Sequence, residues 1–232
     1  MRSPQELYAS PTDSILAEES SRSFMQRVYA WMTGGLALTG VTALVVASQP
    51  QLMVMVSKLM WPLIIGQFVL VLGFSALARK VSTPIAALMF LGYSFTTGLL
   101  FSTLFYVYTS GSIASTFFIT AGAFGALSVF GLVTKRNLSA MSTFLFIGLI
   151  GLVIAGVVNI FLHSEMLSFV ASCAGVLVFA GLTAWDTQKL KTMHASAGYN
   201  SAGSLAINGA LMLYLDFINL FLYLLRLFGR RR

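Results

Sequence analysis

Charge and cysteine are scarce in this chain, and each shortage excludes something. Among 232 residues, 14 are basic and 7 are acidic, so charged residues make up 9% of the chain, where an ordinary soluble domain has about 25%. So few charges cannot cover a soluble globule of this size, which argues against soluble enzymes, disordered chains and nucleic-acid-binding domains. Cys173 is the single cysteine, which excludes an internal disulfide and a zinc site built from cysteines.

Long apolar stretches take the place of the missing charge. Hydrophobic residues make up 57% of the chain, and the mean hydropathy is +0.86. A membrane-spanning helix needs about 20 mostly apolar residues, and uncharged stretches of that length recur from residue 28 onward. The sequence therefore predicts an all-α integral membrane protein with seven transmembrane helices. They are expected near 28–48, 60–79, 85–107, 113–134, 138–162, 166–188 and 204–228.

The first 27 residues differ in composition from the rest. They hold four of the seven acidic residues and many serines, and no basic segment leads directly into an apolar core as in a cleaved signal peptide. None of the five prolines falls in the centre of an expected helix. We therefore expect a partly disordered cytoplasmic tail at 1–27, followed by one transmembrane domain at 28–232.

Lysine and arginine predict the orientation, because the cytoplasmic ends of membrane helices carry an excess of both. Seven crossings put four basic groups on one side, which should be the cytoplasm together with the N-terminus. The same topology puts Arg230, Arg231 and Arg232 on the outer side, against the rule. Either these arginines are tolerated there, or the last helix does not cross fully. The four groups are Arg22 with Arg27, Arg79 with Lys80, Lys135 with Arg136, and Lys189 with Lys191.

Asp216 lies near the middle of the last expected helix, where a carboxylate costs at least about 2.5–3.5 kcal/mol to insert. Helical spacing gathers the polar residues of 204–228 on one face with it, and the other faces are almost entirely apolar. This helix is therefore expected in the bundle interior, with a polar stripe toward a cavity or a neighbour. That face holds Asn208, Gly209, Met212, Asp216, Asn219 and Tyr223.

Asp186 lies near the cytoplasmic end of the helix expected at 166–188, on a face of small and polar residues. If that helix neighbours the last one, Asp186 and Asp216 can meet. Two carboxylates in a low-dielectric site do not both ionise easily, so such a pair shares a proton. Deprotonated, it offers hard oxygen ligands to Ca²⁺. Protonated, it can bond to itself and close a pathway. Arg79 is the best placed basic residue to compete for these carboxylates, with Lys80 behind it.

Simpler interpretations of the same residues remain open. Asp186 can cap its helix or pair with Lys189 three residues on. Asp216 can be a structural hydrogen-bonding group, and Arg79 an ordinary residue of the positive cytoplasmic side. Asp186 also looks shallow and Asp216 deep, so they meet only if the last helix starts shallowly or water enters from the cytoplasm.

The sequence resembles the Bax-inhibitor (transmembrane BAX inhibitor motif) family in a bacterial form. Three segments carry the resemblance: 27–36, Trp185–Gln188 and Asn208–Phe221. The helix count and spacing fit from about residue 25 to the end. The resemblance implies a last helix surrounded by the other six, in the bacterial inner (plasma) membrane. It also implies a pH-sensitive calcium leak without a cofactor, with Asp186 and Asp216 as a proton-sharing dyad that binds Ca²⁺ transiently.

The resemblance further implies that an arginine of the second helix pairs with Asp186 in one state, and Arg79 matches it by location. Some relatives carry an acidic residue within the second helix, where this chain has Gln67 as its one strongly polar residue. The expected partners are the lipid bilayer and calcium or protons, with no nucleic acid.

Two other functions compete with a leak. A regulatory protein would bind a membrane protease or a stress-response partner through its N-terminal tail without moving ions. An intramembrane aspartyl protease also uses two aspartates on consecutive helices, but that class has Gly-x-Gly-Asp at the second one, and this chain has Leu213–Asp216 with Tyr214 and Leu215 between. We therefore expect no enzymatic activity.

Overall fold

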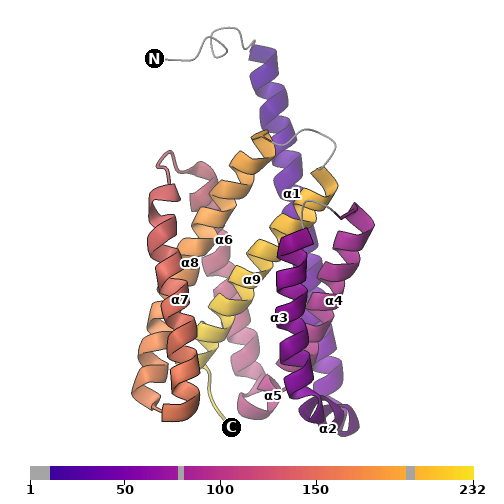
Figure 1. The fold of residues 1–232 in the computed structure, drawn as a ribbon, viewed down its shortest axis with the longest axis vertical. Helices are drawn as coiled ribbons and strands as arrows, with labels where there is room; N and C mark the ends of the chain where they lie inside the picture. Colours follow the sequence, from indigo (N-terminus) through magenta and orange to yellow (C-terminus); the bar gives the residue numbers. More distant parts are fainter. Residues whose placement is uncertain (1–10, 78–80, 197–201) are drawn as a thin grey trace.

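The computed structural model describes residues 11–77, 81–196 and 202–232, and all of its elements in these ranges are helices. The long helices run alternately up and down and stand side by side in one bundle (Figure 1). In chain order they are α1 (Pro11–Ala47), α2 (Pro50–Lys58), α3 (Met60–Leu77), α4 (Thr83–Phe101), α5 (Leu104–Val107), α6 (Ser110–Val133), α7 (Ser139–Leu162), α8 (Glu165–Ser196) and α9 (Ala202–Phe228).

Most of these helices are long and apolar enough to cross a membrane. Six qualify alone, and α2 with α3 makes a seventh span if this pair, bent by 67°, is counted as one. The outward faces of α6 and α7 stay apolar, with Phe118 and Phe144 each 73% exposed, as lipid-facing surfaces require. The chain is thus an all-α integral membrane protein, as the sequence predicts.

The last helix lies at the centre of the bundle. α9 packs directly against α1, α4, α6 and α8, while α3 packs on α4 and α7 packs on α8. Ile207, Leu213 and Tyr214 of α9 are completely buried. The resemblance implied that all six other helices surround α9; in the structure four of them do so directly, and two form an outer layer.

Three boundaries differ from the sequence-based expectation. Residues 11–27, expected as a partly disordered tail, continue α1, because Phe24 and Met25 already pack into the hydrophobic core. The first expected loop contains α2, whose start has Pro50 at the first helical position. α8 continues to Ser196 instead of ending near 188, since Leu190 is buried against the core.

The C-terminus lies at the end of the bundle opposite the start of α1 (Figure 1). Beyond α9, the backbone of Arg230 accepts from Thr109 N–H at 3.1 Å, and Arg232 N–H donates to Val107 at 3.0 Å. Arg230 N–H also donates to Ser112 Oγ at 2.9 Å. The tail is therefore tied to the segment joining α5 to α6. The last helix crosses the bundle fully, which removes one of the two explanations for the C-terminal arginines.

Candidate functional site

α8 and α9 pack against each other in antiparallel fashion along the predicted polar stripe. At one end Gly175 approaches Tyr223 so closely that an added Cβ would lie 2.6 Å from the ring, and Tyr223 also stacks on Phe179. At the other end Leu190 covers Gly209. Small residues at these positions let the two backbones approach closely, as in other membrane helix pairs.

Between these two contacts the structure brings Asp186 and Asp216 together. Their residues are 7% and 5% exposed, respectively. The two carboxyl groups face each other within hydrogen-bonding reach. Among the described residues, no other group donates a hydrogen bond to Asp186 Oδ1 or Asp216 Oδ2. Such a pair is completed by a proton or by a cation.

The apparent difference in depth between the two aspartates is smaller than expected, because α8 is longer than expected. Asp186 lies ten residues before Ser196, the end of α8, and Asp216 lies fourteen residues after Ala202, the start of α9. At about 1.5 Å per residue these are roughly 15 and 21 Å from the same end of the bundle.

Lys189 is the cationic neighbour of the pair in the described part of the chain. Its Nζ lies 4.0 Å from Asp186 Oδ1 and 4.5 Å from the centre of the Trp185 ring. The pairing that the sequence offered as a structural alternative for Asp186 is therefore present, together with the contact to Asp216. Arg79, the predicted latch, falls within 78–80 and lies outside the described residues, as does Lys80.

A cavity of about 610 Å³ opens where α6 meets α7; it is lined by the residues on either side of Asp186 on α8, but by neither aspartate. Trp185 and Lys189 line it on the side nearest Asp186. Gln188 holds its opposite wall by donating to Arg136 O and accepting from Leu138 N–H, both at 2.9 Å. The cavity is basic, since Lys135, Arg136, Lys189 and Lys191 all line it.

The remaining members of the predicted stripe serve packing more than solvation. Asn208 donates to Ser204 O and Asn219 donates to Leu215 O, each at one turn's distance on α9. Arg226 lies 5.5 Å from the centre of the Tyr223 ring. The stripe thus faces α8, but both amides bind carbonyl groups of their own helix.

A buried hydroxyl network on the opposite face of α9 was not predicted. Tyr214 OH lies 2.6 Å from Thr39 Oγ1 of α1, which in turn donates to Ser94 O of α4 at 2.8 Å. One turn further, Gln67 of α3 donates to Thr97 Oγ1 at 2.8 Å. Hydroxyls on apolar helices were the available signal, although nothing in the sequence shows which of them meet.

Two further buried hydroxyls, Ser128 on α6 and Thr187 on α8, have no hydrogen-bond partner among the described residues. The two helices approach closely here, because a Cβ added at Gly131 would lie 2.4 Å from Ala184 O. Within the same ranges, no three His, Cys, Asp or Glu side chains gather as metal ligands. The two aspartates are thus an isolated acidic pair.

Comparison with known proteins agrees with this architecture. The family described as "Inhibitor of apoptosis-promoting Bax1" matches residues 21–232. The inner membrane protein YbhL of Escherichia coli is 46% identical over 228 residues, which covers 95% of this chain and 97% of YbhL. Uncharacterized proteins of Deinococcus radiodurans and Rickettsia prowazekii are 44% and 43% identical; the alignments cover 90% and 93% of this chain and 91% and 92% of theirs. The chain therefore belongs to the Bax inhibitor family of membrane proteins.

Proposed function

We propose that this protein is a passive, pH-sensitive leak for cations, Ca²⁺ foremost, in the bacterial inner membrane. The observation that carries the proposal is the contact between Asp186 and Asp216 at the buried α8–α9 interface. Two carboxylates held this closely in a medium of low dielectric share one proton. A charge inside the membrane is expensive and marks a functional site more often than a structural one.

Gating follows from the proton shared by the pair. With the proton bound, Asp186 and Asp216 hydrogen-bond to each other and hold α8 against α9. Without it, the two carboxylates repel each other and present oxygen ligands, which Ca²⁺ prefers. The ion would retain part of its water shell, because the pair supplies at most about four of the six to eight oxygens that Ca²⁺ takes. Entry should therefore increase as the pH rises.

The charged groups around the pair fit this role. On α8, Lys189 faces Asp186 from the cavity side and balances part of the negative charge. In the described parts of α1, α4 and α6, no ion pair to either aspartate is present. Lys135, Arg136 and Lys191 stand at the cavity wall, where they oppose unrestricted entry of cations. Arg79 stays a predicted latch that competes with the proton for Asp186.

The proposal is tested by reconstituting the purified protein into liposomes that contain a Ca²⁺ indicator. Entry is measured from about pH 5 to about pH 8 for the wild type, Asp186→Asn and Asp216→Asn. Each amide removes the shared proton while it preserves shape, so both variants should lose the pH dependence. The double variant should resemble either single one, because coupled residues are not additive.

Glu165→Gln is the matched control. Glu165 is an exposed carboxylate at the opposite end of α8, so this variant should keep the wild-type pH profile. If wild-type liposomes take up no more Ca²⁺ than empty ones at any pH, the leak is wrong. If the flux exists but Asp186→Asn and Glu165→Gln behave alike, the aspartate pair is not its gate.

A regulatory role is the second proposal, and one observation favours it. The start of α1 projects past the other helices at one end of the bundle (Figure 1), where a partner could contact it. Removal of residues 1–20 should then abolish binding of a membrane protease or stress-response partner and leave ion flux unchanged. A loss of flux in the truncated protein would instead assign this segment to the channel.

The proposed orientation puts the N-terminus in the cytoplasm, as the basic groups favour. Because α9 crosses fully, the C-terminus then faces the periplasm. A reporter that is active only outside the cytoplasm should work when fused after Arg232 and fail when fused before Met1. The reverse result would invert the topology.

A further inference from the structure

An apolar groove of about 640 Å³ runs along the side of the bundle between α1 and α6. α1 packs on α4 and α9, whereas α6 packs on α8 and α9, so α9 separates them and forms the floor with Phe217 and Phe221. Val41 on the α1 rim is 59% exposed and Phe118 on the α6 rim is 73% exposed. In a membrane-spanning bundle, such an open apolar side faces lipid chains.

The length of the groove corresponds to one leaflet. Its α1 wall extends from Thr33 to Leu44, which is twelve residues with about 16 Å between the first and the last. The hydrocarbon core of a bilayer is about 30 Å thick, so the groove covers about half of it. The Leu44 end lies toward the end of the bundle where the C-terminal tail is tied down.

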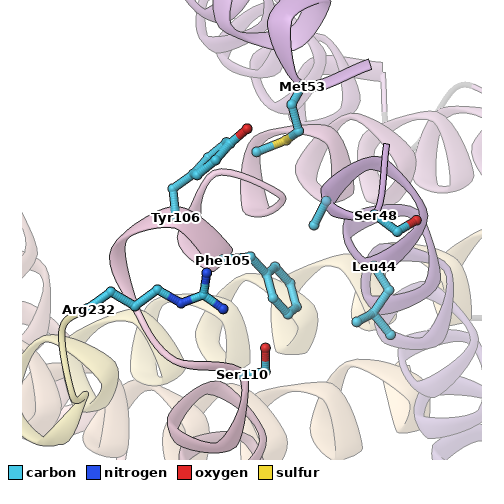
Figure 2. A pocket seen from close by; sticks show the side chains of 8 residues that line it. Leu44, Ser48, Met53, Phe105, Tyr106, Ser110 and Arg232 are labelled. Atoms are coloured by element: carbon cyan, nitrogen blue, oxygen red, sulfur yellow. The ribbon is translucent and has the colours of Figure 1, made fainter. Parts of the chain in front are cut away.

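At that end the groove continues into a second, more polar cavity of about 260 Å³. Leu44, Phe105 and Ser110 line both spaces. Figure 2 shows the guanidinium group of Arg232 and the hydroxyl of Ser110 pointing toward the space between them, with Ser48 on the α1 side. A cationic group and a hydroxyl therefore stand where the apolar groove ends.

Arg232 is positioned there by the fold. Its backbone N–H donates to Val107 O, and the tail before it is tied to Thr109 and Ser112. α6 begins at Ser110, so the positive end of its dipole points toward the same cavity. This end of the bundle is also positively charged overall, because Arg230, Arg231 and Lys58 lie there. Glu165 is the one acidic side chain among the described residues of this end.

We propose that the groove and the cavity together bind one anionic phospholipid of the leaflet on the C-terminal side. An acyl chain occupies the groove between α1 and α6, and the phosphate accepts hydrogen bonds from Arg232, with Ser110 as a further donor. A guanidinium group is well suited to phosphate, because its donors match the phosphate oxygens in pairs. The net negative headgroup of phosphatidylglycerol complements the arginines of this end, whereas the zwitterionic headgroup of phosphatidylcholine does so less.

The experiment uses the full-length protein in detergent, titrated with phosphatidylglycerol or phosphatidylcholine, with bound lipid counted by native mass spectrometry. The wild type should bind one phosphatidylglycerol more tightly than it binds phosphatidylcholine. Arg232→Gln should weaken phosphatidylglycerol binding about tenfold, the loss expected for a hydrogen bond to a charged group. Arg231→Gln, on the neighbouring residue that does not line the cavity, is the matched control and should leave binding within about twofold.

A second pair of variants tests the groove itself. A Cβ added at Gly40, which lines the groove, meets nothing within 4 Å, and the same is true of Gly34 on another face of α1. Gly40→Phe fills the space that the acyl chain would occupy and should reduce binding of both lipids. Gly34→Phe should not. Glycerol phosphate, which has the headgroup chemistry without an acyl chain, should compete poorly with phosphatidylglycerol.

Several outcomes would overturn the proposal. Equal binding of the two lipids, equal effects of Arg232→Gln and Arg231→Gln, or full competition by glycerol phosphate would each do so. If the variants prove unstable, the wild type alone decides: a phosphatidylglycerol with a photoactivatable acyl chain should crosslink to residues 33–44 and 110–118. Crosslinks confined to the exposed face of α7 would place the lipid elsewhere.

Discussion

The central helix α9 carries polar groups on two faces, and the two faces are built in opposite ways. Toward α1 and α4, Tyr214 OH belongs to a network in which its partner Thr39 also binds Ser94 O and Gly35 O. Toward α8, Asp216 meets Asp186, and each keeps a buried oxygen without a donor among the described residues. The Tyr214–Thr39 contact is satisfied by protein groups alone, although the nearby Ser94 Oγ has no partner among the described residues. The aspartate pair, in contrast, requires a proton or a cation.

This difference separates structural polarity from functional polarity. A satisfied buried network stabilises one arrangement of helices, because breaking any bond leaves a polar group unpaired. An incomplete pair has two states that differ in charge. We therefore expect changes on the α1–α4 side to act on stability, and changes on the α8 side to act on gating.

The largest effect on stability should come from Gly98→Ala. A Cβ at Gly98 would lie 2.6 Å from Thr42 Cβ and 2.8 Å from Thr39 O, where the backbone of α1 cannot yield. We expect a loss of about 1–3 kcal/mol in the free energy of unfolding, measured by denaturant titration in detergent. Gly92→Ala on the same helix meets nothing within 4 Å and should gain up to about 1 kcal/mol from helix propensity. Equal effects would show that α1 and α4 are not closely packed.

Tyr214→Phe should have the next largest effect, a loss of about 1–2 kcal/mol in the free energy of unfolding. The single proton of Thr39 already serves a backbone carbonyl, so Tyr214 is the donor in their 2.6 Å contact. The pH profile of Ca²⁺ entry should keep its shape. Tyr106→Phe, at a side chain that is 64% exposed, should stay within about 0.5 kcal/mol. A changed pH profile in Tyr214→Phe would mean that the two faces are coupled.

Asp216→Asn should change stability by less than about 1 kcal/mol, because its amide can donate to Asp186. Its counterpart on the other face is Thr39→Val, which preserves shape and removes the hydroxyl that Tyr214 contacts at 2.6 Å. That variant should lose about 1–3 kcal/mol in the free energy of unfolding. The free energy of unfolding of both variants, measured under the same conditions, shows which variant loses more stability. The comparison fails if Asp216→Asn is the more damaging of the two.

Lys189→Gln should have the smallest effect. Its side chain is 39% exposed and 4.0 Å from Asp186, and exposed pairs contribute at most about 1 kcal/mol. Removal of the positive charge should move half-maximal Ca²⁺ entry to higher pH by less than about 0.7 pH units. Lys191→Gln, whose Nζ binds Leu132 O, should leave the midpoint unchanged. A shift to lower pH in Lys189→Gln would contradict the assignment of Lys189 to the pair.

Much of the fold follows from the sequence because lipid imposes simple requirements. Uncharged stretches locate the helices, and the polar face around Asp216 identifies α9 as the inner helix. The sequence locates the start of α1 and the end of α8 less accurately. Phe24 and Leu190 are buried by contacts with distant parts of the chain. Hydropathy does not distinguish an apolar residue that contacts protein from one that contacts lipid.

The site was predictable in its residues but not in its surroundings. Helical spacing alone gathers Gly175, Phe179 and Asp186 on one face of α8, so a meeting with Asp216 could be expected. The contact between Tyr214 and Thr39 could not be predicted. It depends on the relative rotation of α9 and α1, and the two residues are 175 positions apart in sequence. The roles assigned to Asp186 and Asp216 stay predictions.

The tied C-terminal tail has a mechanical consequence for the aspartate pair. Because Arg230 is bound to Thr109 and Ser112, the lower end of α9 acts as a pivot. Asp216 lies fourteen residues above Arg230, or about 21 Å along the helix axis. A tilt of about 5° around this pivot would move its carboxyl by about 2 Å, enough to separate two hydrogen-bonded oxygens. Opening of the pair therefore requires no break in α9. Shortening the tail should make the tilt of α9 easier.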